Sequence, residues 1–423
     1  MRVEIRDIDE KGRGIGYLNS RKIIVPKTLP GEIVDIKKFY KKKKQVIARE
    51  YDLIDVSPRR INPRCKFFAM CGGCSLQHVS YEDQLELKKN RLLGIYGSEL
   101  GGIEIIPSPK IYDYRNRMDY TVISNGIGLR EQGRWYSVIN ISSCELMYKS
   151  GLALKALREL MDKEGIRGYN LQTHEGIIRY LVVREGKNTG EIMINLVVTK
   201  DLLPRMLDNY FEFADSIYVS INDSLTDISM GNPSRIIGKE YIRERLLDTT
   251  YLIHPNSFFQ TNSFQAENML KIIEKNIQGE RILDLYSGVG TFSIFLARRE
   301  YNVIGVENNS FSVHIAEMNK KLNNINEKNA RFIESEAERF NLKELGDFTT
   351  VIVDPPRPGL HPKVVKNLLK LSPERIIYVS CNPETQKRDY ELLREKYRIM
   401  DMVALDMFPH TFHIETVMTL ERK

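Results

Sequence analysis

The sequence has few cysteines and lacks a long apolar run. Only five cysteines occur in 423 residues, and no stretch of about 18 apolar residues is present, so we expect no membrane-spanning helix. Residues 1–7 carry charges where a secretory signal needs an apolar core. We therefore expect a cytoplasmic protein, whose cysteines are metal ligands or catalytic groups rather than disulfide partners.

The excess of positive charge is small. Lys and Arg number 63 and Asp and Glu number 56, which gives a net charge of +7. This balance permits a polyanionic partner without requiring one. A run of six lysines, Lys37–Lys38 and Lys41–Lys44, flanks Phe39–Tyr40. Lysine runs are often solvated faces or hairpin tips, but aromatic residues inside one favour nucleic-acid binding through phosphate contacts and stacking.

The patterning along the chain predicts three domains. Residues 1–55 hold five short apolar runs separated by turn signals, which predicts an OB-like β-barrel. Residues 56–250 predict a central, mostly β domain with a helix at about 148–163. The segment 80–111 begins with a helical pattern, and we expect it to pack on the C-terminal domain.

Strands and helices alternate from residue 251 to residue 423, which predicts an α/β domain with a doubly wound parallel sheet, Rossmann-like in class. Catalytic groups in such sheets follow the carboxyl ends of strands. The expected strands are Arg281–Leu285, Asn302–Glu307, Thr350–Asp354 and Ile376–Ser380.

A glycine-rich turn follows the first of these strands. Gly288 and Gly290 allow a ligand to approach the backbone, but position 293 is serine, so the loop is not the dinucleotide fingerprint. Glu307 ends the next strand, where a carboxylate can accept hydrogen bonds from ribose hydroxyls. Together with Asp354-Pro355-Pro356-Arg357, this arrangement resembles class I S-adenosylmethionine (SAM) methyltransferases rather than dehydrogenases.

The cysteines divide into a group of four and a single residue. Cys65, Cys71, Cys74 and Cys144 supply four thiolates, which suit either tetrahedral zinc or a [4Fe–4S] cluster. Cys381 stands alone after the apolar run that ends the last expected strand, a position where a thiol can act as a nucleophile.

The chain resembles the RNA (uracil-5-)-methyltransferases over nearly its full length. In this family the N-terminal barrel is a TRAM domain that binds RNA. The motifs that carry the resemblance are Leu29–Glu32, the segment from Cys65 to His78, Phe258–Asn262, Asp354–Gly359, Ser380–Pro383 and Phe408–Glu415.

The resemblance implies roles for individual residues. Cys381 is expected to be the nucleophile that adds to C6 of a uracil, and Glu415 the base that removes the C5 proton. The four other cysteines are expected to hold a [4Fe–4S] cluster rather than zinc. The residues expected to contact SAM are Gln260, Tyr286, Thr291, Glu307 and Asp354.

The expected activity is therefore SAM-dependent methylation of C5 of a uridine in structured RNA, either 23S rRNA or position 54 of tRNA. The target must be unpaired or flipped out to reach the thiol. An RNA cytosine-5 methyltransferase would use the same thiolate chemistry, but a cysteine would be expected near Asp354-Pro355-Pro356, where this chain has none. A non-catalytic RNA-binding protein is the other alternative. We expect a monomer with no obligate protein partner.

Overall fold

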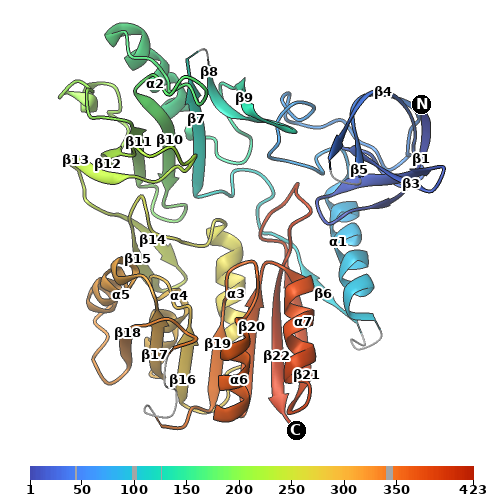
Figure 1. Cartoon of the computed structure of the whole chain (residues 1–423). Coiled ribbons are helices and arrows are strands. Elements are labelled where there is room, and N and C mark those ends of the chain that lie inside the picture. The colour runs from blue at the N-terminus through green and yellow to red at the C-terminus, as the bar shows by residue number, and fades with distance from the viewer. Residues whose placement is uncertain (43–44, 98–101, 125, 340–345) are drawn as a thin grey trace.

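The computed structural model describes residues 1–42, 45–97, 102–124, 126–339 and 346–423. Lys43 and Lys44, the end of the predicted lysine run, lie outside the described residues. Figure 1 shows the barrel, the central sheet and the C-terminal α/β unit as three bodies, with helix α1 between the barrel and the α/β unit.

The N-terminal region forms a closed barrel of five strands in the order β1-β2-β3-β5-β4, which confirms the predicted barrel. Alternate residues of the strands point inward and form a small aliphatic core that includes Ile5, Ile23 and Val34. The strands are β1 (Arg2–Ile8), β2 (Arg13–Leu18), β3 (Arg21–Pro26), β4 (Ile33–Lys42) and β5 (Gln45–Asp55).

The central region is a seven-stranded sheet in the order β13-β12-β11-β10-β7-β8-β9. Helix α2 (Ser150–Glu164) buries Leu154, Leu157 and Leu160 in a core shared with the sheet. The strands are β7 (Arg117–Ile123), β8 (Gly126–Glu131), β9 (Arg134–Asn140), β10 (Ile178–Glu185), β11 (Ile192–Val198), β12 (Ser216–Ile221) and β13 (Asn232–Gly238). A 3-10 turn spans Leu207–Asn209, and the hairpin β14 (Ile242–Leu246) and β15 (Thr249–Ile253) leads into the C-terminal unit.

The C-terminal unit is built on an eight-stranded sheet in the order β18-β17-β16-β19-β20-β22-β21-β6. The first five strands are parallel, as predicted, but β22 runs antiparallel to β20 and to β21, so the sheet is mixed. Its strands are β16 (Arg281–Leu285), β17 (Asn302–Glu307), β18 (Ala330–Glu334), β19 (Thr350–Val353), β20 (Arg375–Ser380), β21 (Tyr397–Leu405) and β22 (Glu415–Arg422). Its helices are α3 (Ser263–Lys275), α4 (Thr291–Ala297), α5 (Ser310–Leu322), α6 (Pro362–Leu371) and α7 (Pro383–Leu393).

The segment that precedes the central sheet packs on the C-terminal unit. Strand β6 (Glu104–Ile106) extends the eight-stranded sheet by pairing with β21, and helix α1 (Tyr81–Tyr96) lies beside α7 (Figure 1). The limits 1–55, 56–250 and 251–423 stay predictions. Within the described residues, none of the helices has the length and apolar character needed to cross a bilayer.

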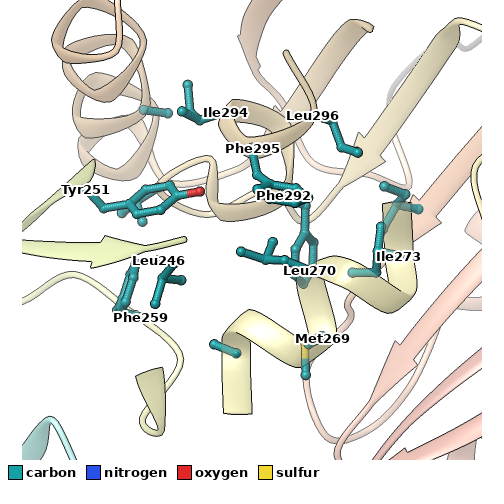
Figure 2. Packing of buried hydrophobic residues seen from close by; sticks show 14 of the residues in the cluster. Leu246, Tyr251, Phe259, Met269, Leu270, Ile273, Phe292, Ile294, Phe295 and Leu296 are labelled. Atoms are coloured by element: carbon teal, nitrogen blue, oxygen red, sulfur yellow. The ribbon is translucent and has the colours of Figure 1, made fainter. Parts of the chain in front are cut away.

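A large apolar core fixes the start of α4. Figure 2 shows Phe292 and Phe295 of α4 packed among residues of α3, β14 and β15. Tyr251 is fully buried there, and its hydroxyl donates a hydrogen bond of 2.8 Å to the carbonyl of Thr291, the first residue of α4. The core therefore sets the position of the glycine turn that precedes this helix.

Candidate active site

The sheet order brings the predicted catalytic residues to one edge. Strand β20 ends at Ser380, so Cys381 follows its carboxyl end, and the antiparallel β22 begins at Glu415 on the same edge. Ser380 pairs with Thr416, which makes Cys381 and Glu415 neighbours across two adjacent strands. Asp354 follows β19, the neighbour of β20 on its other side.

The electrostatic environment confirms that Cys381, Glu415, Asp354 and Arg357 are close together. Burial raises the pKa of the Cys381 thiol to about 11, and Glu415 and Asp354 add to this rise, whereas the charge of Arg357 and its hydrogen bond oppose it. Burial, followed by the charge of Asp354, raises the pKa of Glu415 well above its usual value, and Arg357 again opposes the rise. Arg357 is therefore the cation that favours the ionised form of both groups.

Arg357 is held in place by the helix that follows the thiol. Its carbonyl accepts hydrogen bonds from the side chains of Asn382 (3.1 Å) and Thr385 (3.3 Å), and its guanidinium lies 3.0 Å from Nδ1 of His413. The structure places Arg357 beside Cys381 and Glu415.

The glycine turn and Glu307 form a second part of the site. Glu307 Oε2 accepts a hydrogen bond from the amide of Gly288 (3.1 Å), and Oε1 accepts one from the amide of Asn309 (2.9 Å). Gly290 is the N-cap of α4 with a φ of 83°, and a Cβ there would lie 2.9 Å from the ring of Phe332. The turn therefore requires glycine at position 290, both for its left-handed backbone and for the space beside it.

Tyr286 and Gln260 border the same region. Tyr286 has a φ of 66°, an uncommon value for a residue with a side chain, and burial raises its pKa to about 12. Gln260 Nε2 lies 3.4 Å from Asp354 Oδ2, and Asn116 binds the Gln260 carbonyl through a hydrogen bond of 2.7 Å. The structure thus connects the segment 258–262 to the carboxylate that follows β19.

Asp284 is a buried carboxylate for which no role was predicted from the sequence. It is the fourth residue of β16, and one oxygen accepts a hydrogen bond of 2.6 Å from Ser293. Its other oxygen and the hydroxyl of Ser287 have no partner among the described residues. Burial raises the pKa of Asp284 to about 7. Burial also raises the pKa of Asp354 to about 7, and the nearby charge of Asp284 adds to this rise. Its place at the start of the glycine motif was the signal that could have identified it.

The four remaining cysteines gather around one cavity. Cys65, Cys71, Cys74 and Cys144 are all free and line a cavity of about 680 Å³. Two of the sulfurs accept hydrogen bonds, Cys71 from the amide of Gly73 (3.4 Å) and Cys74 from Gln77 Nε2 (3.2 Å). Among the described residues, no three His, Cys, Asp or Glu side chains are arranged as a ready site for a metal ion.

Burial makes two of these thiols poor acids. It raises the pKa of Cys74 to about 12 and that of Cys144 to about 11. Lys27 contributes positive charge nearby: its ammonium donates to the carbonyls of Phe68 and Cys71, and it enters from the barrel. A bound cation would have to displace the thiol protons, as thiolate ligands require.

The loop 406–414, which leads to Glu415, is held in place by contacts with the N-terminal half of the chain. The carbonyl of His410 accepts hydrogen bonds from the amides of Ser75 and Leu76, each 2.9 Å long, directly after Cys74. Gln84 of α1 accepts one from the amide of His410 (2.8 Å). Phe412 packs in a small core with Leu76 and residues of the barrel. The barrel, the cysteine segment and α1 therefore all contact the catalytic loop.

Comparison with known proteins identifies the family. The family model described as "tRNA (Uracil-5-)-methyltransferase" matches residues 80–423. The chain belongs to the RNA uracil-C5-methyltransferase family. A second model, described as the TRAM domain of tRNA (uracil(54)-C(5))-methyltransferase, matches residues 1–59. The predicted family, fold class and enzyme type are confirmed. As a member of this family, the chain is an RNA uracil-C5-methyltransferase, which excludes the two alternatives, a cytosine-5 methyltransferase and a non-catalytic RNA-binding protein.

Individual relatives cover the whole chain. The tRNA (uracil(54)-C(5))-methyltransferase of Pyrococcus furiosus is 47% identical over 423 residues and covers 100% of both chains. The 23S rRNA (uracil(747)-C(5))-methyltransferase of Pyrococcus horikoshii is 41% identical, also with 100% of both chains covered. The crystal structure of the Pyrococcus abyssi tRNA (uracil-54, C5)-methyltransferase in complex with S-adenosyl-L-homocysteine superimposes with a TM-score of 0.90 at 44% identity, covering 99% of each chain.

Proposed function

We propose that this chain methylates C5 of uridine 54 in tRNA, with Cys381 as nucleophile and Glu415 as base. The observation that carries the chemistry is the adjacency of Cys381 and Glu415 on the paired strands β20 and β22, with Arg357 beside both. The choice of tRNA is supported by the relatives named for uridine 54, which are 46–47% identical, whereas those named for 23S rRNA are 38–41% identical.

The nucleophile makes C5 of the uracil reactive. Addition of the Cys381 thiolate to C6 turns C5 into an enolate-like carbon. This carbon forms a bond to the methyl group of SAM as the S–CH3 bond breaks and S-adenosyl-L-homocysteine leaves. Glu415 then removes the C5 proton, the C5–C6 double bond re-forms, and the sulfur of Cys381 leaves from C6. The thiolate is thus regenerated, and the proton ends on Glu415.

The raised pKa values determine when these groups become active. At neutral pH a thiol with a pKa of about 11 is almost wholly protonated. Arg357 favours the thiolate, and additional positive charge near the thiol would increase its fraction further. A raised pKa suits Glu415 because a weakly acidic carboxyl is the stronger base once it is ionised.

The second part of the site fits SAM, which supplies the methyl group and a positively charged sulfonium. Unpartnered polar atoms on Asp284 and Ser287 and open space beside Gly288 support a ligand at this turn. We assign Glu307 to the ribose hydroxyls. The other residues assigned to SAM are Gln260, Tyr286, Thr291 and Asp354.

The four cysteines around the cavity fit a [4Fe–4S] cluster. A single zinc ion needs all four sulfurs within about 2.3 Å of one point. A four-iron cluster occupies more space and suits sulfurs that surround a cavity, with the hydrogen bonds from Gly73 and Gln77 to two of them. Visible absorption near 400 nm after anaerobic purification, lost in Cys74→Ser, supports the cluster, whereas a colourless zinc-loaded protein contradicts it.

The test of function compares two RNAs and two variants. The wild-type protein should methylate a tRNA transcript at position 54 and leave a 23S rRNA fragment that contains uridine 747 unmodified; the reverse outcome would replace the proposed target. Cys381→Ala should abolish methylation and form no covalent complex. Glu415→Gln should instead trap a methylated RNA–protein adduct that survives denaturing electrophoresis, because the elimination step is blocked.

A further inference from the structure

The loop 222–231, which connects β12 to β13, exposes three apolar side chains. Leu225 is 74% exposed, Ile228 49% and Met230 43%. Single exposed apolar residues are ordinary on protein surfaces. Three such side chains lie within six residues of one loop, and exposed apolar residues grouped in this way can mark an interaction site.

The loop backbone is fixed by one buried arginine. Arg179 is almost fully buried, and its Nη1 donates hydrogen bonds to the carbonyls of Asn222 (2.8 Å) and Ser224 (2.6 Å). Its Nη2 donates to the carbonyl of Thr226 (2.6 Å). The first half of the loop is therefore tied to the central sheet by a single guanidinium.

The buried amide of Asn222 continues this pattern. Its Nδ2 lies 3.3 Å from the carbonyl of Ile228 and 2.8 Å from that of Met230. The side chains of Arg179 and Asn222 thus bind the carbonyls at alternate positions from 222 to 230, while the apolar side chains of the loop stay exposed to solvent. A loop ordered in this way meets a partner without a large loss of backbone entropy.

The loop is linked both to the wall of the cysteine cavity and to the segment that carries Gln260. The carboxylate of Asp227 accepts two hydrogen bonds from Arg130 (3.0 and 2.9 Å), and Arg130 lines the cysteine cavity. On the other side, Asn256 Nδ2 donates to the carbonyl of Gly231 (2.8 Å). Phe258, which is 67% exposed, follows two residues later and leads to Gln260.

We propose that Leu225, Ile228 and Met230 form an apolar ridge that packs against the bases beside the target uridine and replaces its stacking when it is flipped out. The inference rests on the proposed function: the loop is joined to the segment that carries Gln260, so an RNA that presents a uridine beside Gln260 lies near these side chains. The three side chains carry no hydrogen-bonding group, so they read no base edge, and apolar side chains of this kind act as wedges between bases.

The test uses the triple variant Leu225→Ser/Ile228→Ser/Met230→Ser in the full chain. Two RNAs carry the same uridine: a folded tRNA transcript and a short unstructured oligonucleotide in which the uridine is already unstacked. We expect kcat/KM to fall roughly 10- to 100-fold on the folded RNA and less than about 3-fold on the oligonucleotide, since only the folded RNA requires unstacking. The matched control is Leu152→Ser/Leu202→Ser, which changes two exposed leucines outside the loop.

Each outcome bears on one proposal. Unchanged activity of the triple variant on folded RNA, or an equal loss on both RNAs, overturns the ridge. A control variant with the same selective loss also overturns it, because the effect would then not belong to the loop. If the wild-type protein methylates neither RNA, the proposed function fails, independently of the ridge. Fluorescence of 2-aminopurine placed beside the uridine gives a second readout, and it should rise on binding to the wild-type protein but not to the triple variant.

Discussion

Lys88 of α1 and Asp406 form a fully buried ion pair. Lys88 Nζ lies 2.6 Å from Asp406 Oδ1, and neither side chain is exposed. Burial lowers the pKa of Lys88, whereas Asp406 opposes this change. Asp406 begins the connection from β21 to Glu415, so the pair ties α1 to the loop that carries the proposed base.

Removal of Lys88 alone should be costly. Lys88→Met leaves Asp406 buried without a counter-charge, and we expect a loss of about 3–5 kcal/mol in the free energy of unfolding. The double variant Lys88→Met/Asp406→Leu should recover most of this loss, because no unpaired charge remains. Urea unfolding of the three proteins measures the effect. A single variant as stable as the wild type would show that the pair does not carry its charges in the folded protein.

A second change tests Arg357 as the cation beside Cys381. In Arg357→Gln, the pKa of the thiol should rise further, so the reactive thiolate becomes scarcer at neutral pH. We expect kcat to fall by about the same factor, roughly 10- to 100-fold, at every pH from 7 to 9, because both thiols are mostly protonated throughout this range. Arg357→Lys keeps the charge and should lose less. An equal loss in Arg357→Lys and Arg357→Gln would argue against this role, because the lysine keeps the positive charge.

Four strands of the C-terminal sheet were predictable because they are mostly apolar, and three of the four predicted ranges end at a polar residue. Two of the predicted strands, Arg281–Leu285 and Asn302–Glu307, match the structure residue for residue. The antiparallel position of β22 was not predicted, since an apolar strand carries no mark of its direction. Strand β6 has three residues, too few for a pattern, and it is fixed only by its pairing with β21.

The periodicity of α1 predicted a helix but not its buried face. Leucines suggested an apolar stripe, yet Leu93 is exposed, and the buried positions include Gln84 and Lys88. These polar residues are buried because the catalytic loop offers them partners, His410 and Asp406. Such pairing depends on segments more than 300 residues apart, which local sequence patterns do not reveal.

The glycine turn allows two alanine variants to be compared. Gly290→Ala introduces a left-handed alanine and a clash with Phe332, so we expect a loss of about 2–3 kcal/mol in unfolding free energy. A Cβ at Gly288, with a φ of 55°, would meet nothing within 4 Å, so Gly288→Ala should cost only about 1 kcal/mol. If SAM occupies the open space beside Gly288, however, this variant should lose more binding free energy for S-adenosyl-L-homocysteine than free energy of unfolding. Calorimetric binding of S-adenosyl-L-homocysteine and urea unfolding separate the two effects, and equal affinities of Gly288→Ala and the wild type would place the ligand elsewhere.

Asp284 gives the last prediction, a dependence of stability on pH. Burial raises its pKa in the folded protein to about 7, from 3.8. The folded state therefore binds more protons than the unfolded state between these values, so this carboxyl reduces stability as the pH rises from about 4 to 7. Asp284→Asn removes the titrating group and should be more stable than the wild type at pH 8, by at most about 4 kcal/mol, and little different at pH 4. Urea unfolding of both proteins at pH 4 and pH 8 measures this difference in stability. If the stability of the variant relative to the wild type decreased with rising pH, the pKa of Asp284 would not be raised. Weaker binding of S-adenosyl-L-homocysteine by the same variant would show that the protein retains this destabilising carboxylate for its ligand.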